Sequence, residues 1–173
     1  MAMLDVAIVV LEGRNIRGLA NDVHELRLSR LLTNSEADQT ATAQRMQEVS
    51  ARLVNIDEPI RWHDYAWVAG LFGILGFSVP GAAGLLLGAT AVVFLLFAYG
   101  AINREHEYGQ LKFHVTALAD EIFADMESVE KQRKNPRLSE QIETFRDYYS
   151  EAETLAGQVS ILTRMEQAVP FRV

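Results

Sequence analysis

Apolar residues gather in one central stretch of the chain. No Asp, Glu, Lys, Arg or His occurs between Tyr65 and Ile102. As a single helix, this stretch would be about 57 Å long at ~1.5 Å per residue, nearly twice the ~30 Å thickness of a bilayer's hydrocarbon core. The stretch is therefore too long for one membrane span.

A turn is predicted near the middle of this stretch, at Phe77-Ser78-Val79-Pro80-Gly81. Pro80 lacks a backbone donor and disfavours helix at Val79, while Gly81 permits a tight turn. The pattern predicts a membrane helical hairpin, made of two transmembrane or re-entrant helices, with limbs at about 64–79 and 82–102. The alternative is a water-soluble bundle with this hairpin in its core, which needs more amphipathic partners than the remaining residues provide.

Both flanking regions show apolar positions at helical spacing. Two such stripes precede the hairpin. The first, interrupted near Gly13 and Gly18, consists of Ile16, Leu19, Val23, Leu26 and Leu31. The second consists of Thr42, Met46, Val49, Leu53 and Ile56. A spacing of three and four residues is typical of a helix that buries one side against a partner. The N-terminal region is therefore predicted to be an amphipathic helical arm.

The C-terminal region continues this pattern. One stripe follows the second limb directly and predicts a long helix that leaves the membrane: Tyr108, Leu111, Val115, Leu118, Ile122, Met126 and Val129. Pro136 interrupts this helix. A second stripe then predicts a helix that folds back antiparallel: Leu138, Ile142, Phe145, Ala152, Leu155, Val159 and Leu162. The predicted fold is all-α, with an N-terminal arm (1–63), a hairpin (64–102) and a C-terminal arm of two helices broken near 136 (103–173). Arm contacts are expected at Met46, Val49, Leu53, Leu118, Ile122, Leu155 and Val159.

Glycines recur along both predicted limbs: Gly70, Gly73 and Gly76 on the first, and Gly84 and Gly88 on the second, after the turn residues Pro80 and Gly81. Such rows let membrane helices approach closely. They fit either packing of the two limbs against each other or an oligomer interface. A constitutive aqueous pore is disfavoured, because Ser78 and Thr90 are the only small hydroxyl side chains in the apolar stretch.

Aromatic and basic residues indicate how the hairpin would lie in a membrane. The interfacial anchors are predicted to be Trp62, Tyr65, Trp67 and Tyr99, near the open ends of both limbs. All 16 basic residues lie outside the turn. By the positive-inside rule both termini are expected to be cytoplasmic, in a bacterial inner membrane or an organellar inner membrane.

Composition and motifs argue against catalysis and nucleic-acid binding. The net charge of −7 disfavours contact with phosphate backbones, and the absence of cysteine removes disulfides and thiolate metal sites. His106-Glu107 begins a zincin-like pattern, but position 110 is Gln, so the second ligand is missing. We therefore expect no catalytic residue, no metal and no cofactor.

Three functions fit these features. The first is a non-catalytic integral membrane scaffold or accessory subunit that is anchored by the hairpin in membrane lipids and assembles through its helical arms, as a homo-oligomer or within a larger membrane complex. The second is an oligomeric pore-forming or membrane-permeabilising effector. The third is a monotopic wedge that lies in one leaflet and curves the membrane.

Overall fold

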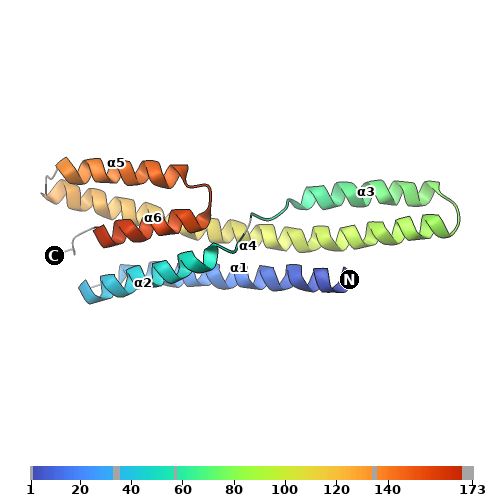
Figure 1. Ribbon diagram of the computed structural model, residues 1–173, viewed down its shortest axis with the longest axis horizontal. Helices are drawn as coiled ribbons and strands as arrows, with labels where there is room; N and C mark the ends of the chain where they lie inside the picture. The colour runs from blue at the N-terminus through green and yellow to red at the C-terminus, as the bar shows by residue number, and fades with distance from the viewer. Residues whose placement is uncertain (1, 33–35, 57, 134–135, 169–173) are drawn as a thin grey trace. The chain divides into compact units, whose positions relative to one another are not determined.

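The computed structural model describes residues 2–32, 36–56, 58–133 and 136–168, and the described residues form six helices and no strand. The helices are α1 (Ala2–Leu31), α2 (Glu36–Leu53), α3 (Trp62–Ser78), α4 (Ala82–Arg133), α5 (Pro136–Glu151) and α6 (Leu155–Ala168) (Figure 1). The all-α prediction is confirmed.

The chain divides into two compact units, and two helices contribute to both. Unit 1 comprises Met1–Gly18 and Glu58–Gly109, and unit 2 comprises Leu19–Asp57 and Gln110–Val173. The sequence pattern predicts boundaries after residues 63 and 102 instead. Each unit therefore consists of two separate segments of the chain, and α1 and α4 each pass from one unit into the other.

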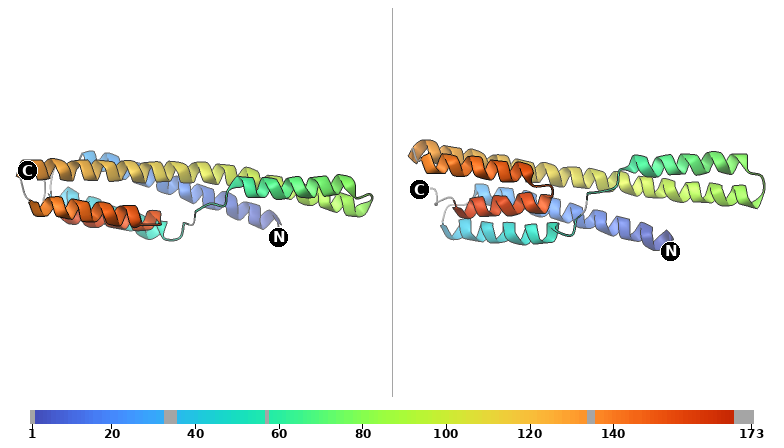
Figure 2. Two further views of the ribbon diagram at one scale, coloured as in Figure 1. Left: turned by 90° about the horizontal axis from the view of Figure 1, so that it is seen from above. Right: turned by 45° about the horizontal axis from the view of Figure 1, so that its top comes forward.

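In unit 1, α3 and the first part of α4 run antiparallel and side by side (Figures 1 and 2). Helix α3 ends where Val79 takes an extended conformation (φ −106°, ψ 116°), as expected for a residue before proline. Gly81 then adopts a positive φ of 82°, which only glycine reaches without strain, and α4 begins at Ala82. Local backbone chemistry therefore explains the turn.

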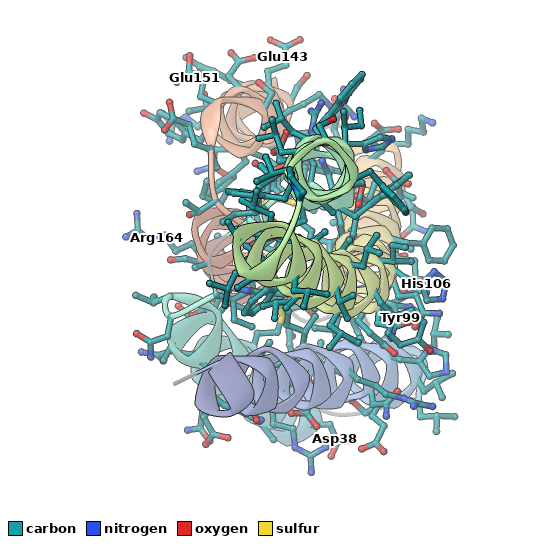
Figure 3. All side chains as sticks on the ribbon, turned by 90° about the vertical axis from the view of Figure 1, so that its right-hand side faces the viewer. Asp38, Tyr99, His106, Glu143, Glu151 and Arg164 are labelled. Carbon is teal, nitrogen blue, oxygen red and sulfur yellow. The ribbon has the colours of Figure 1, made fainter. Side chains whose placement is uncertain are left out.

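Unit 2 is a bundle built from the end of α1, α2, the end of α4, α5 and α6. Its core consists of apolar side chains that are at most 2% exposed, contributed by α1, α2, α4 and α6: Val23, Met46, Leu53, Leu111, Val115, Leu118, Ile122, Met126, Val159, Leu162 and Met165. Charged residues such as Glu143, Glu151 and Arg164 point away from α5 and α6 (Figure 3). The bundle thus has a buried apolar core and a charged surface.

Two expected helix boundaries are wrong. Helix α1 continues unbroken through Gly13 and Gly18, where an interruption is predicted. The stripe expected to form one helix after Pro136 is divided at residues 152–154 into α5 and α6. Thr154 caps the new helix, because its Oγ1 accepts a hydrogen bond of 3.1 Å from the Gly157 N–H.

Candidate membrane-interaction site

The contact between α3 and α4 is made by small residues and by pairs of aromatic rings. Ala69 of α3 and Ala91 and Ala98 of α4 are buried, and Ala91 lies opposite Gly73. The rings of Phe72 and Phe94 stack with centroids 5.8 Å apart, and those of Tyr65 and Phe97 stack at 5.9 Å. The predicted interfacial anchor Tyr65 therefore takes part in packing within the pair of helices.

The glycines of the two rows differ in their surroundings. A Cβ atom on Gly76 would lie 2.9 Å from the Gly88 backbone nitrogen, and a Cβ atom on Gly84 would lie 1.9 Å from the Val79 carbonyl oxygen. A Cβ atom on Gly70 or Gly88 would meet nothing within 4 Å, and one on Gly73 would only touch the Ala91 Cβ at 4.0 Å. Close approach of α3 and α4 therefore requires glycine at positions 76 and 84, but not at 70 or 88.

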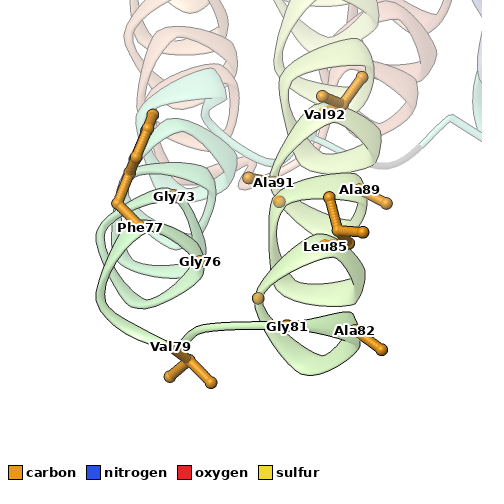
Figure 4. A pocket seen from close by; sticks show the side chains of 12 residues that line it. Gly73, Gly76, Phe77, Val79, Gly81, Ala82, Leu85, Ala89, Ala91 and Val92 are labelled. Carbon is orange, nitrogen blue, oxygen red and sulfur yellow. The ribbon is translucent and has the colours of Figure 1, made fainter.

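An open, apolar groove lies near the turn, on the pair of helices. Gly73, Gly76, Gly84 and Gly88 line it, together with the side chains of Phe77 and Leu85 (Figure 4). The nearby hydroxyls of Ser78 and Thr90 each donate to a carbonyl of their own helix, Ile74 O and Leu86 O, at 2.9 Å. Neither hydroxyl therefore needs a further acceptor.

Large apolar side chains of α3 and α4 are exposed along the pair of helices. Phe77 is 98% exposed and Trp67 is 79% exposed. The same holds for Leu71, Ile74, Leu85, Leu86, Val92, Leu95, Leu96, Tyr99 and Ile102. Two predicted anchors, Trp67 and Tyr99, are thus largely exposed, whereas Trp62 is half-buried and stacks on His63 with ring centroids 3.9 Å apart.

Among the described residues, α4 is the one helix that is long and apolar enough to cross a membrane by length and composition. Its most apolar stretch has a mean hydropathy of 2.3, and 17% of that stretch is buried. Helix α3 has 17 residues, about 25 Å at ~1.5 Å per residue. The region of α4 from Ala82 to Ile102 is about 31 Å long by the same measure.

The residues predicted as arm contacts lie together in unit 2. Met46, Val49 and Leu53 of α2 are at most 6% exposed. Leu118 and Ile122 of α4 are at most 1% exposed, and α6 contributes the buried Leu155 and Val159. These positions therefore form the core of the chain's own bundle.

Ion pairs between helices are the main feature that the sequence did not reveal. Arg30 of α1 has a side chain only 5% exposed; its Nη1 lies 2.6 Å from Asp125 Oδ2 of α4, and its Nε lies 3.0 Å from Glu166 Oε2 of α6. Gln39 of α2 donates to the Glu166 carbonyl at 2.9 Å. The expected stripe on α1 was wrong at its end, since Leu31 is 65% exposed and Arg30 is buried. A basic residue four positions after Leu26, on the buried side of α1, is the signal that could have revealed this site.

Two histidines also meet within unit 2. The rings of His24 on α1 and His114 on α4 have centroids 5.0 Å apart. Burial lowers the pKa of His114, and the nearby His24 and Arg27 lower it further. The uncharged form of the His114 ring is therefore favoured.

In the part of the chain that the structure describes, no three His, Cys, Asp or Glu side chains are grouped so that they could hold a metal ion. Comparison with models of known protein families, with curated proteins and with solved structures finds no match.

Proposed function

We propose that this protein is a non-catalytic integral membrane scaffold. In this proposal α3 and the apolar part of α4 insert into a bilayer as a helical hairpin. The bundle of unit 2 stays in the cytoplasm and holds other proteins, or further copies of the chain, at the membrane.

One observation supports the membrane part above all others, the exposure of large apolar side chains on α3 and α4. A water-soluble monomer rarely exposes a contiguous apolar patch larger than a few hundred Å². Here leucines, valines and aromatic rings are exposed along both helices, and little of the most apolar stretch of α4 is buried. Acyl chains could cover these side chains without leaving a hydroxyl group unpaired in lipid, because Ser78 and Thr90 already donate hydrogen bonds within their own helices.

The scaffold part is supported by the composition of unit 2. Its apolar core is closed by its own helices, and ion pairs join α1 to α2, α4 and α6. A folded bundle of this kind offers a charged helical surface with a fixed shape. Such a surface can bind another protein without a catalytic group.

A monotopic wedge is the second candidate, and the length of α3 favours it. Its 17 residues measure about 25 Å, less than the ~30 Å hydrocarbon core. A hairpin that stops inside the bilayer would, however, leave backbone groups of the turn without water. A full span of α4 with local thinning beside α3 avoids that cost.

The test uses the natural absence of cysteine. Val79→Cys places one thiol at the turn, and Glu143→Cys on the exposed side of α5 is the matched control. A maleimide that does not cross membranes is added to either side of sealed vesicles. We expect Val79→Cys to react from the far side and Glu143→Cys from the cytoplasmic side.

Other outcomes separate the alternatives. Protection of Val79→Cys from both sides, with the protein retained in the pellet after alkaline carbonate, would identify the wedge. Release by carbonate would refute membrane insertion altogether. Crosslinking through Glu143→Cys in native membranes that yields monomer alone would refute the scaffold.

A further inference from the structure

Within unit 2, three pairs of polar side chains follow one another along the contact between α1 and α4. His24 faces His114; Arg27 donates through Nε to Glu121 Oε1 at 3.1 Å; and Arg30 binds Asp125. Because the residue numbers increase together on both helices, α1 and α4 run parallel here. We call these six residues the α1–α4 seam.

The first pair differs from the other two, because it lacks a negative charge. His114 Nδ1 is buried without a hydrogen-bond partner, and the Phe113 ring lies at its edge with centroids 5.6 Å apart. The neighbouring position on α1 is Arg27, whose guanidinium is bound to Glu121. Neutral histidines fit this place, whereas charged ones would stand beside each other and beside a third positive charge.

We propose that the α1–α4 seam is an acid-sensitive latch, in which protonation of His24 and His114 loosens α1 from α4. Two unit charges 5.0 Å apart repel each other even in water strongly enough to change an equilibrium about fourfold. Partial burial increases this effect, because protein screens charge less well than water. Acidification therefore raises the population in which the end of α1 has separated from α4.

Other charged residues of unit 2 lie on α1, α2, α4 and α5. On α1 and α2, a separate groove holds Asp22, Glu25, Arg45, Glu48 and Arg52. On the side of α5, Glu127 binds Arg146 at 2.8 Å, and Asp120 lies near Tyr149. Histidine is the side chain whose ordinary charge change falls between pH 5 and 8, so a response between pH 7.5 and 5.5 belongs to histidine.

The experiment measures the distance between α1 and α4 in the full chain, reconstituted in lipid nanodiscs. Leu28→Cys and Ala124→Cys carry spin labels on exposed positions of α1 and α4. Pulsed EPR at pH 7.5 and 5.5 should show at least a fourfold rise in the long-distance population. His24→Gln with His114→Gln should abolish this rise.

The chain provides a matched control. It has four histidines, and the other two, His63 and His106, belong to unit 1. His63→Gln with His106→Gln should leave the pH response unchanged. An unchanged response in the His24/His114 variant, or no response in the native chain, would overturn the proposal.

A second measurement covers the case in which the double variant does not fold. His24 is exposed, so His24→Gln alone should preserve the bundle. In ¹³C-labelled protein, the NMR titration of His114 should move to higher pH when His24 is removed, because a repelling charge is gone. An identical titration in both proteins would show that the two rings are not coupled and would refute the latch.

Discussion

Replacing Gly84 by alanine should weaken the pairing of α3 with α4, whereas the same change at Gly88 should not. Both glycines lie on α4, one helical turn apart, in the sequence Gly84-x-x-x-Gly88. The added Cβ of Gly84→Ala would lie 1.9 Å from the Val79 carbonyl oxygen and 2.8 Å from that of Gly76. The corresponding atom of Gly88→Ala would meet nothing within 4 Å.

The magnitude follows from two opposing contributions. Alanine favours helix over glycine by about 1 kcal/mol, and this gain applies at both positions. At Gly84 the turn must also move by about 1.5 Å to restore ordinary contact at 3.4 Å, and overpacking of this kind costs about 1–3 kcal/mol or more. We expect Gly84→Ala to weaken the pairing by about 1.4 kcal/mol, which is tenfold, and Gly88→Ala to leave it equal or up to fivefold stronger.

A disulfide equilibrium measures this pairing directly. Phe72→Cys with Phe94→Cys replaces two stacked rings and introduces the only thiols of the chain. Equilibration with glutathione in lipid bilayers gives the effective concentration of one thiol near the other. Equal values for Gly84→Ala and the parent, or an equal loss in Gly88→Ala, would refute the reasoning. If Gly70 and Gly88 form an oligomer interface, alanine there should reduce crosslinked dimer without changing this value.

Three further predictions concern unit 2. Arg30→Met leaves Glu166 buried without a charge partner, so it should lower the free energy of unfolding by about 3–5 kcal/mol. Arg52→Met, at the exposed ion pair with Asp22, should lower it by less than about 1 kcal/mol. Chemical denaturation in detergent, followed by circular dichroism, measures both values. Ile122→Ala should cost about 2–5 kcal/mol in the same assay, against about 0.5 kcal/mol for Phe113→Ala, because Ile122 is fully buried and Phe113 is 65% exposed. Burial raises the pKa of the Tyr149 hydroxyl; the hydrogen bond with Thr116 opposes this shift and the nearby Asp120 adds to it. The unfolded chain therefore loses the Tyr149 proton at lower pH than the folded chain, and the free energy of unfolding should fall as pH rises above 10. Tyr149→Phe should remove this part of the alkaline loss of stability, which thermal midpoints measured from pH 9 to 11 would show.

Local patterns sufficed to predict the helices and most of the buried side chains. The stripe Leu111 to Val129 on α4 is buried as expected, because burial of one helical side repeats with the period of the helix itself. The turn was also predictable, since Pro80 and Gly81 restrict the backbone whatever surrounds them. These are the features that depend on neighbours in sequence.

The errors occur where distant residues decide the outcome. Arg30 is buried in place of Leu31 because Asp125 and Glu166, far away in the sequence, neutralise its charge. Helix α1 passes Gly18 because one glycine costs only about 1 kcal/mol, and burial of Ile16 and Leu19 on either side offsets it. Neither effect can be inferred from helical spacing alone.

Helix α4 shows why the membrane proposal depends on exposure and not on hydropathy. A core helix of a soluble protein is also apolar, but its apolar side chains are buried by neighbours. The second half of α4 shows this behaviour, with Leu111, Val115 and Ile122 fully buried in the bundle. The first half is more apolar, yet Leu85, Leu86 and Leu95 are more than half exposed. One continuous helix thus has two kinds of surroundings, and the proposal assigns lipid to the half that the protein itself leaves uncovered.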